Sequence, residues 1–171
     1  MSRTYDTDRA FANRTLHLAK GAVGNITAVP TSPWVDNNEA ADLELVSFGV
    51  RGLGKDIRVA SRLRRAGYEK YEFEFTLRCW RLSGVKTELE KILEGYCDWL
   101  IYGHVSPCER FLTGWWGIDL NVFRACYALG ECGPLKVKPN KDGTTKFRVF
   151  NVRQFPRVPP LVLGTNRKDF K

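Results

Sequence analysis

The feature that most constrains the fold is a series of short segments between residues 43 and 78 in which apolar and polar side chains alternate. In residues 57–65, IRVASRLRR, apolar side chains stand at positions 57, 59 and 63 and arginines at 58, 62 and 64. A two-residue period places successive side chains on opposite faces of a strand. Residues 71–78, YEFEFTLR, alternate still more regularly. A sheet is therefore expected, in which residues 57–65 have one apolar and one cationic face.

Helices are expected where a capping side chain precedes a segment with helical spacing of its apolar residues. The clearest case combines Thr87 and Glu90, which match a capping box, with apolar residues at the i, i+3, i+4 and i+7 positions and Gly95 to end the helix. Gly130 is placed to end another helix. The expected helices are residues 9–20 after Asp8, the segment after Thr87, and residues 122–129 after Asn121.

The remaining strands differ in character. DWLIYG and WWGIDL are continuously apolar and are expected to be buried, whereas ADLELVSFG is expected to pair with IRVASRLRR as a hairpin with a longer loop. The turn of residues 140–143, NKDG, predicts a hairpin near the C-terminus. On that hairpin the alternation predicts Val137, Phe147 and Val149 on one face and Lys136, Lys138, Lys146 and Arg148 on the other.

The chain has 171 residues and is expected to form one core domain, residues 1–134, extended by a basic hairpin, residues 135–153, and an extended C-terminal arm, residues 154–171. Its net charge of +8 is unevenly distributed, because residues 51–70 carry +5 and residues 135–171 carry +8, while the remainder is mildly acidic. Two basic blocks on an acidic body predict a polyanionic partner. A nucleic acid, DNA rather than RNA, is the expected partner.

Several other classes of protein are disfavoured. No apolar run is long enough for a membrane helix and no secretory signal is present, so a cytoplasmic protein with no membrane partner is expected. Five cysteines without a Cys-x-x-Cys pair predict free thiols rather than a zinc site, although His104 lies near three of them in the sequence. No phosphate-binding loop of the Walker type occurs.

The order of helix, strand, ADLEL strand, IRVASRLRR strand, helix and DWLIYG strand resembles the PD-(D/E)XK nuclease-like superfamily, as in small phage-encoded proteins. The resemblance covers residues 8–129, and the blocks SGVKTELEKIL, DWLIYGH and WWGIDLNVFR carry most of it. It implies an α/β (α+β) fold with a central mixed sheet flanked by helices, similar to restriction endonucleases, with the basic hairpin appended. It also implies binding to DNA, and cleavage of phosphodiester bonds that depends on Mg²⁺.

The resemblance assigns roles to particular residues, and the motif is degenerate. Asp42 falls at the position of the first metal-binding aspartate, but Ala60 and Arg62 stand where a Glu-x-Lys pair belongs. Alanine holds no metal, and arginine cannot act as a general base because its pKa is above about 12. Asp56, followed by Ile57 and Arg58, or Glu74 on the neighbouring strand, are the two replacements for the missing carboxylate.

Three hypotheses follow. The first is a nuclease in which Asp42, with Asp56 or alternatively Glu74, binds Mg²⁺, and Arg58 or Arg62 contacts the scissile phosphate. The second is a binding protein without catalysis, and the third is a phage protein that binds and inhibits a host protein complex. Each of the three hypotheses is compatible with a homodimer. The residues expected to contact nucleic acid are Arg58, Arg62, Arg64, Arg65, Lys136, Lys138, Lys146 and Arg148.

Overall fold

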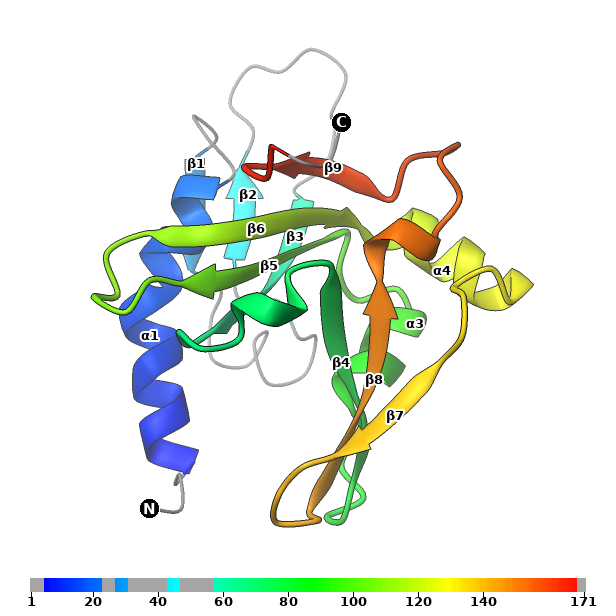
Figure 1. The fold of residues 1–171 in the computed structure, drawn as a ribbon, viewed down its shortest axis with the longest axis horizontal. Helices are drawn as coiled ribbons and strands as arrows, with labels where there is room; N and C mark the ends of the chain where they lie inside the picture. The colour runs from blue at the N-terminus through cyan, green and yellow to red at the C-terminus, as the bar shows by residue number, and fades with distance from the viewer. Residues whose placement is uncertain (1–4, 23–26, 31–42, 47–56, 169–171) are drawn as a thin grey trace.

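The computed structural model describes residues 5–22, 27–30, 43–46 and 57–168. These residues form a mixed α+β structure with two sheets (Figure 1). The mixed character that the sequence predicts is therefore confirmed. The elements are α1 (Tyr5–Ala22), β1 (Thr27–Pro30), β2 (Leu43–Val46), β3 (Ile57–Arg64), the 3-10 helix η1 (Glu69–Tyr71), β4 (Glu74–Arg81), α3 (Glu88–Leu93), β5 (Trp99–Val105), β6 (Leu112–Asp119), α4 (Leu120–Leu129), β7 (Lys136–Pro139), β8 (Thr145–Asn151), η2 (Val152–Gln154) and β9 (Val162–Thr165).

The larger sheet, sheet A, has six strands in the order β1-β2-β3-β5-β6-β9. The expected hairpin of β2 and β3 is present, with Leu43 opposite Val59. β3 and β5 run parallel, and the other neighbouring pairs are antiparallel. A parallel pair needs a long crossover, which here contains β4 and α3. The C-terminal segment is part of this sheet, because β9 pairs with β6.

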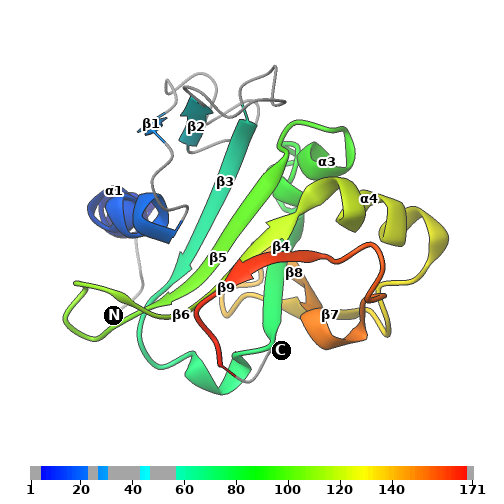
Figure 2. The same ribbon diagram turned by 90° about the horizontal axis from the view of Figure 1, so that it is seen from above.

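Different elements pack on the two faces of sheet A (Figure 2). α1 lies on one face, where Ala19 packs with Val59 and Ile101 in a small buried cluster. The other face packs against α3, α4 and the second sheet, and the main core lies there. The strict alternation of β3 explains this division, because its odd-numbered residues point to α1 and its even-numbered residues to the main core.

The smaller sheet, sheet B, has the order β4-β8-β7, and its strands run across the direction of sheet A (Figure 1). Aromatic side chains fill the space between sheet B and α4. The ring of Phe75 stacks on Phe150 with centroids 5.1 Å apart, and Phe123 meets Phe150 edge-on at 5.0 Å. All three side chains are at most 1% exposed. Such aromatic pairs stabilise a core beyond the area that they bury.

The prediction that Glu74 lies on a strand neighbouring β3 is wrong. β3 pairs with β2 and β5, whereas β4, which carries Glu74, pairs with β8 in sheet B. The physical reason is that alternation fixes which side chains share a face but contains no information on the neighbouring strand. Glu74 therefore belongs to a different sheet from β3.

The predicted capping box is confirmed at α3. Thr87 accepts a hydrogen bond from the backbone N–H of Glu90, and the Glu90 carboxylate accepts one from the backbone N–H of Thr87 at 2.6 Å. The hydrogen bond from the Thr87 backbone N–H, and after it the Thr87 hydroxyl, lower the pKa of the Glu90 carboxyl. The helix ends before Gly95, which has a φ of 92°, as the sequence predicts.

Two predicted caps are wrong. α4 begins at Leu120, and its cap is Asp119, which accepts hydrogen bonds from the backbone N–H groups of Asn121 and Val122. Asn121 therefore lies inside the helix rather than before it. Similarly, α1 begins at Tyr5, so Asp8 lies within its first turn and does not cap it. Both errors are shifts of a helix start along a segment that offers several capping residues.

Replacing Thr87 by alanine tests the capping box. We expect the alanine variant to be about 1 kcal/mol less stable than the serine variant at the same position. Thr87→Ala and Thr87→Ser both remove the methyl group of this buried side chain. Only Thr87→Ala also removes the hydroxyl that accepts from the backbone N–H of Glu90. The midpoint of urea-induced unfolding measures the difference. Equal midpoints for the two variants would show that the cap does not stabilise α3.

The predicted division of the C-terminal hairpin into an apolar and a cationic face is wrong. β7 and β8 pair with Lys136 opposite Val149 and Lys138 opposite Phe147. Directly opposed residues share a face, so these two lysines stand beside Phe147 and Val149. All four residues of β7 are exposed, so no apolar face of β7 fixes its register. β8, in contrast, is held on its other side by β4.

Candidate functional site

The cationic face of β3 points toward sheet B. Arg62 and Arg64 lie on this face, whereas the guanidinium of Arg65 lies on the opposite face, 4.1 Å from the ring centroid of Phe11 on α1. Phe147 of β8 is the common neighbour on the sheet B side, because Arg62 and Arg64 approach its ring at 5.0 and 5.8 Å. The arginines therefore connect the two sheets through cation–π contacts.

Arg62 is largely buried and forms an ion pair. Its guanidinium donates to the carboxylate of Glu88, and the two side chains are 15% and 16% exposed. The same Glu88 oxygen accepts a hydrogen bond of 3.1 Å from the backbone N–H of Arg78. Burial lowers the pKa of Arg62 to about 10, an effect that Glu88 opposes. The Arg62 charge is thus neutralised inside the protein, and its expected phosphate contact stays a prediction.

Arg64 is held at the end of β3 by two hydroxyl groups. Its Nε donates to the Tyr102 hydroxyl at 2.8 Å, and its Nη2 donates to the hydroxyl of Thr76 on β4. Neither partner carries a charge, so no carboxylate neutralises Arg64 in these contacts. Positive charge therefore persists where β3 and β5 face sheet B.

A cavity of about 230 Å³ opens beside Arg64, between the ends of β3 and β5, the η1 region and the β7–β8 hairpin. We call it the inter-sheet cavity. Its polar lining includes Arg64, Lys138, His104 and Glu74. Its aromatic lining consists of Tyr68, Tyr71, Tyr102 and Phe147.

Several side chains of the cavity lining are exposed enough to contact a ligand. Tyr68 and Tyr71 are 40% and 36% exposed, although both are aromatic. The Lys138 ammonium lies 5.0 Å from the ring centroid of Tyr71 and 4.0 Å from the carboxylate of Glu74. Because Lys138 is 53% exposed, its pair with Glu74 is a weak surface interaction.

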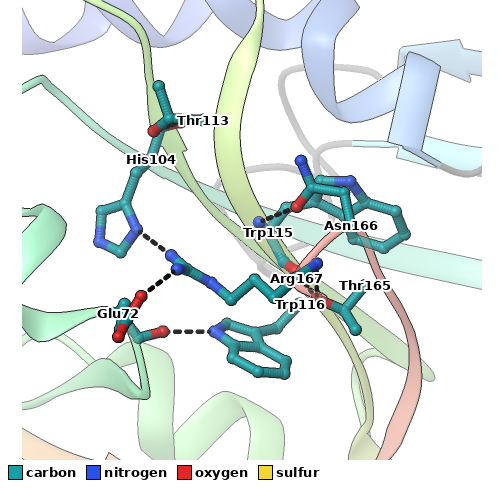
Figure 3. A network of polar contacts seen from close by, with 8 residues as sticks. All are labelled: Glu72, His104, Thr113, Trp115, Trp116, Thr165, Asn166 and Arg167. Carbon is teal, nitrogen blue, oxygen red and sulfur yellow. Dashed lines mark hydrogen bonds and ion pairs between the residues drawn. The ribbon is translucent and has the colours of Figure 1, made fainter. Parts of the chain in front are cut away.

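A polar network closes the cavity at His104 (Figure 3). Arg167, just beyond β9, donates from Nη2 to His104 Nδ1 at 3.0 Å and from Nη1 to the Glu72 carboxylate at 2.8 Å. The Trp116 indole donates to the Glu72 carbonyl at 2.7 Å. Since a guanidinium only donates, Nδ1 is the acceptor and the proton of neutral His104 is on Nε2. Burial first, and then Arg167, lower the pKa of His104 to about 4.

The other predicted binding residues are dispersed. Lys146 lies 5.0 Å from the ring of Trp80, on the face of sheet B away from Lys138, and Arg148 bonds to the Tyr127 hydroxyl on that same face. Lys136 is exposed on β7. Arg58 lies on β3, where its backbone N–H donates to Asp98. Of the eight predicted cationic residues, the cavity lining brings together Arg64 and Lys138.

The predicted metal site lies largely outside the described residues. Asp42 and Asp56 belong to segments that the structure does not describe. Within the described part of the chain, no group of three or more histidine, cysteine, aspartate or glutamate side chains could hold a metal ion. The five cysteines, all of which the structure describes, form no disulfide with one another, and Cys108 is exposed. Mg²⁺ binding therefore stays a prediction that rests on the resemblance.

No family model, curated protein or solved structure matches this chain. Among the described residues, none of the helices combines the length and the hydrophobicity needed to cross a bilayer.

Sequence reasoning missed the cavity because its lining comes from four separate segments. The aromatic residues of YEFEFTLR and DWLIYG were expected in strands, which gave no indication that Tyr71 and Tyr102 line one space. Arg167 carried no signal beyond its positive charge, and it contacts His104 across 63 positions of sequence. The two-residue alternation of β3, in contrast, did indicate which arginines would share a face.

Proposed function

We propose that this protein binds nucleic acid at the inter-sheet cavity and along the cationic residues around it. The observation that carries the proposal is the lining, in which four aromatic rings stand beside Arg64 and Lys138. Aromatic rings stack on bases, and lysine and arginine attract phosphates. The two basic blocks of the sequence contribute one cation each, from β3 and from β7.

The order of elements supports a fold of the PD-(D/E)XK nuclease-like type. α1, β1, β2, β3, α3 and β5 occur in the same order as in the resemblance, with β4 inserted between β3 and α3. The parallel pair β3 and β5 is joined through β4 and α3. Sheet B, formed by β4 and the basic hairpin, is an addition to that arrangement.

The proposal is for binding rather than cleavage. Arg62, the residue at the lysine position of the degenerate motif, is paired with Glu88 and buried, and Glu74 belongs to sheet B. A nuclease activity would depend on Asp42 and Asp56. Cleavage of labelled DNA in Mg²⁺ or Mn²⁺, compared between the natural chain and Asp42→Ala, tests that activity separately.

Salt dependence tests the binding proposal. Anisotropy of labelled single-stranded DNA, duplex DNA and RNA is measured between about 50 and 200 mM salt, over which phosphate-driven affinity falls steeply. We expect Lys138→Gln to weaken binding and to lower the slope of log K against log salt by about 1. Lys20→Gln, on α1 and hence on the other side of sheet A (Figure 2), is the matched control.

Two results would contradict the proposal. If no nucleic acid binds at the lowest salt, the protein does not have this function, and a host protein becomes the leading partner. If Lys138→Gln and Lys20→Gln have the same effect, binding occurs elsewhere on the surface than at the cavity.

A further inference from the structure

We infer that the inter-sheet cavity accepts one unpaired nucleobase and that guanine fits it best. The inference rests on the proposed nucleic-acid binding and goes further, because it names the form of nucleic acid and the base. It is carried by three properties of the cavity: its aromatic lining, its size, and the presence of one carboxylate and one imidazole in its polar lining.

The aromatic lining requires a base whose faces are free. Tyr71 precedes β4, Tyr102 lies on β5 and Phe147 lies on β8, so rings reach the cavity from both sheets and from η1. A base in a duplex is already stacked on both faces and paired along its edge. Proteins stack aromatic rings on bases that are single-stranded or turned out of a helix. The cavity is therefore suited to an unpaired base.

The size of the cavity limits the ligand to a small planar group. Its volume of about 230 Å³ is below the range of about 300–1,000 Å³ that is typical of pockets for drug-sized ligands. A single base is a fragment of such a ligand, and a second stacked base would have to remain at the exposed mouth beside Tyr68 and Tyr71.

The polar lining orients the ligand. Among the described residues, Glu74 is the only carboxylate that lines the cavity, and a carboxylate accepts hydrogen bonds and repels phosphate. The base edge is therefore directed to Glu74 and the phosphate away from it. Lys138, which is 53% exposed and lies 4.0 Å from the same carboxylate, attracts the strand to this side of the cavity. His104 supplies a donor, because Arg167 occupies its Nδ1 and leaves the proton on Nε2.

Guanine is the base whose pairing edge complements these groups. Its edge has two adjacent N–H donors, at N1 and N2, next to the O6 acceptor. A carboxylate accepts two parallel N–H bonds, and the imidazole N–H complements O6. Adenine and cytosine present a ring acceptor beside their amino group, and thymine has one N–H between two acceptors. Each of these three bases would place at least one acceptor against Glu74.

Single-base substitutions in an oligothymidylate test the inference. The probes are fluorescently labelled oligothymidylate strands that carry one central guanine, hypoxanthine, adenine or thymine, together with the duplex of the guanine strand. We expect the guanine strand to bind about 5- to 100-fold more tightly than the adenine strand. Hypoxanthine, which lacks the N2 amino group, should be intermediate, and the duplex should bind more weakly than the single strand.

Glu74→Gln identifies the residue responsible. Glutamine offers one acceptor and one donor, so we expect the ratio of guanine to adenine affinity to fall to about 1. The affinity for the plain oligothymidylate should remain, which shows that the variant is folded. Glu131→Gln, an exposed change outside the cavity lining, removes the same charge and should leave the guanine preference intact.

The outcomes separate this inference from the proposed function. Equal binding of all strands and of the duplex would overturn the unpaired-base inference and leave nucleic-acid binding in place. A guanine preference that persists in Glu74→Gln would overturn the role of Glu74. Failure of every probe to bind at low salt would overturn the proposed function itself.

Discussion

Replacing Glu88 by alanine is expected to lower the free energy of unfolding by about 3–5 kcal/mol, because it leaves the buried charge of Arg62 without its counterion. The side chains of the pair are 15% and 16% exposed, so water does not replace the lost carboxylate fully. The backbone N–H of Arg78 on β4 loses its acceptor in the same variant. The Glu88 carboxylate therefore joins three elements: α3, β3 and β4. Urea-induced unfolding followed by tryptophan fluorescence measures the loss.

Two matched variants separate the buried charge from a general effect of the substitution. The double change Arg62→Met with Glu88→Leu removes both charges and keeps apolar volume, so it should recover most of the lost stability. Glu94→Ala breaks the exposed pair with Lys86, whose side chains are 47% and 45% exposed, and should leave the unfolding midpoint nearly unchanged. If Glu88→Ala behaves like Glu94→Ala, the Arg62 pair does not hold the two sheets together.

The ion pair of Arg62 with Glu88 also indicates the roles of the arginines on β3. β3 carries arginines on its even-numbered face, and the sequence offered phosphate binding as their role. Arg62 forms an ion pair with Glu88 of α3. Arg64, in contrast, donates hydrogen bonds to hydroxyl groups at the inter-sheet cavity. Neighbouring positions on one face therefore divide between fixing sheet B to sheet A and lining the cavity.

Features governed by local chemistry could be predicted from the sequence. The capping box at Thr87, the end of α4 before Gly130 and the turn at residues 140–143 each depend on a few consecutive residues. A glycine with positive φ, such as Gly130 at 74°, ends a helix regardless of the rest of the fold. The alternation of β3 was equally local and correctly placed Arg62 and Arg64 on one face.

Features that depend on distant partners could not be predicted. β4 follows β3 closely in sequence, yet it pairs with β8, so that Phe75 lies opposite Phe150. Neither strand carries a signal for that choice, since alternation is compatible with any neighbour. The inter-sheet cavity is a consequence of this pairing, because it places Phe147 and Lys138 opposite Arg64. The cavity therefore could not be predicted without knowing which strand pairs with β4.

Lowering the pH from 7 toward 4 is expected to destabilise the protein through His104. The pKa of His104 is about 4 in the folded protein and about 6.5 in the unfolded chain. Between these values the unfolded chain binds more protons, so stability falls as the pH falls through this window. A shift of this size corresponds to at most about 3 kcal/mol. Well above pH 6.5 the residue is neutral in both states and contributes no pH dependence.

The charges around His104 explain why it resists protonation. Burial is the largest cause, and the positive charges of Arg167 and Arg64 act in the same direction, whereas Glu69 opposes them. A proton on Nδ1 would also face the Arg167 guanidinium, which lies 3.0 Å away and can only donate. Protonation would therefore break one of the contacts that attach the segment after β9, while the bond of Arg167 to Glu72 remains.

Comparison with His104→Gln isolates this contribution from that of the carboxylates, which titrate in the same range. Glutamine provides an oxygen that accepts from Arg167 and does not titrate, so its stability should fall less between pH 6.5 and 4.5 than that of the natural chain. His17→Gln, on the exposed side of α1, should keep the natural pH dependence. Parallel curves for His104→Gln and the natural chain would show that His104 is protonated as easily in the folded protein as in the unfolded chain.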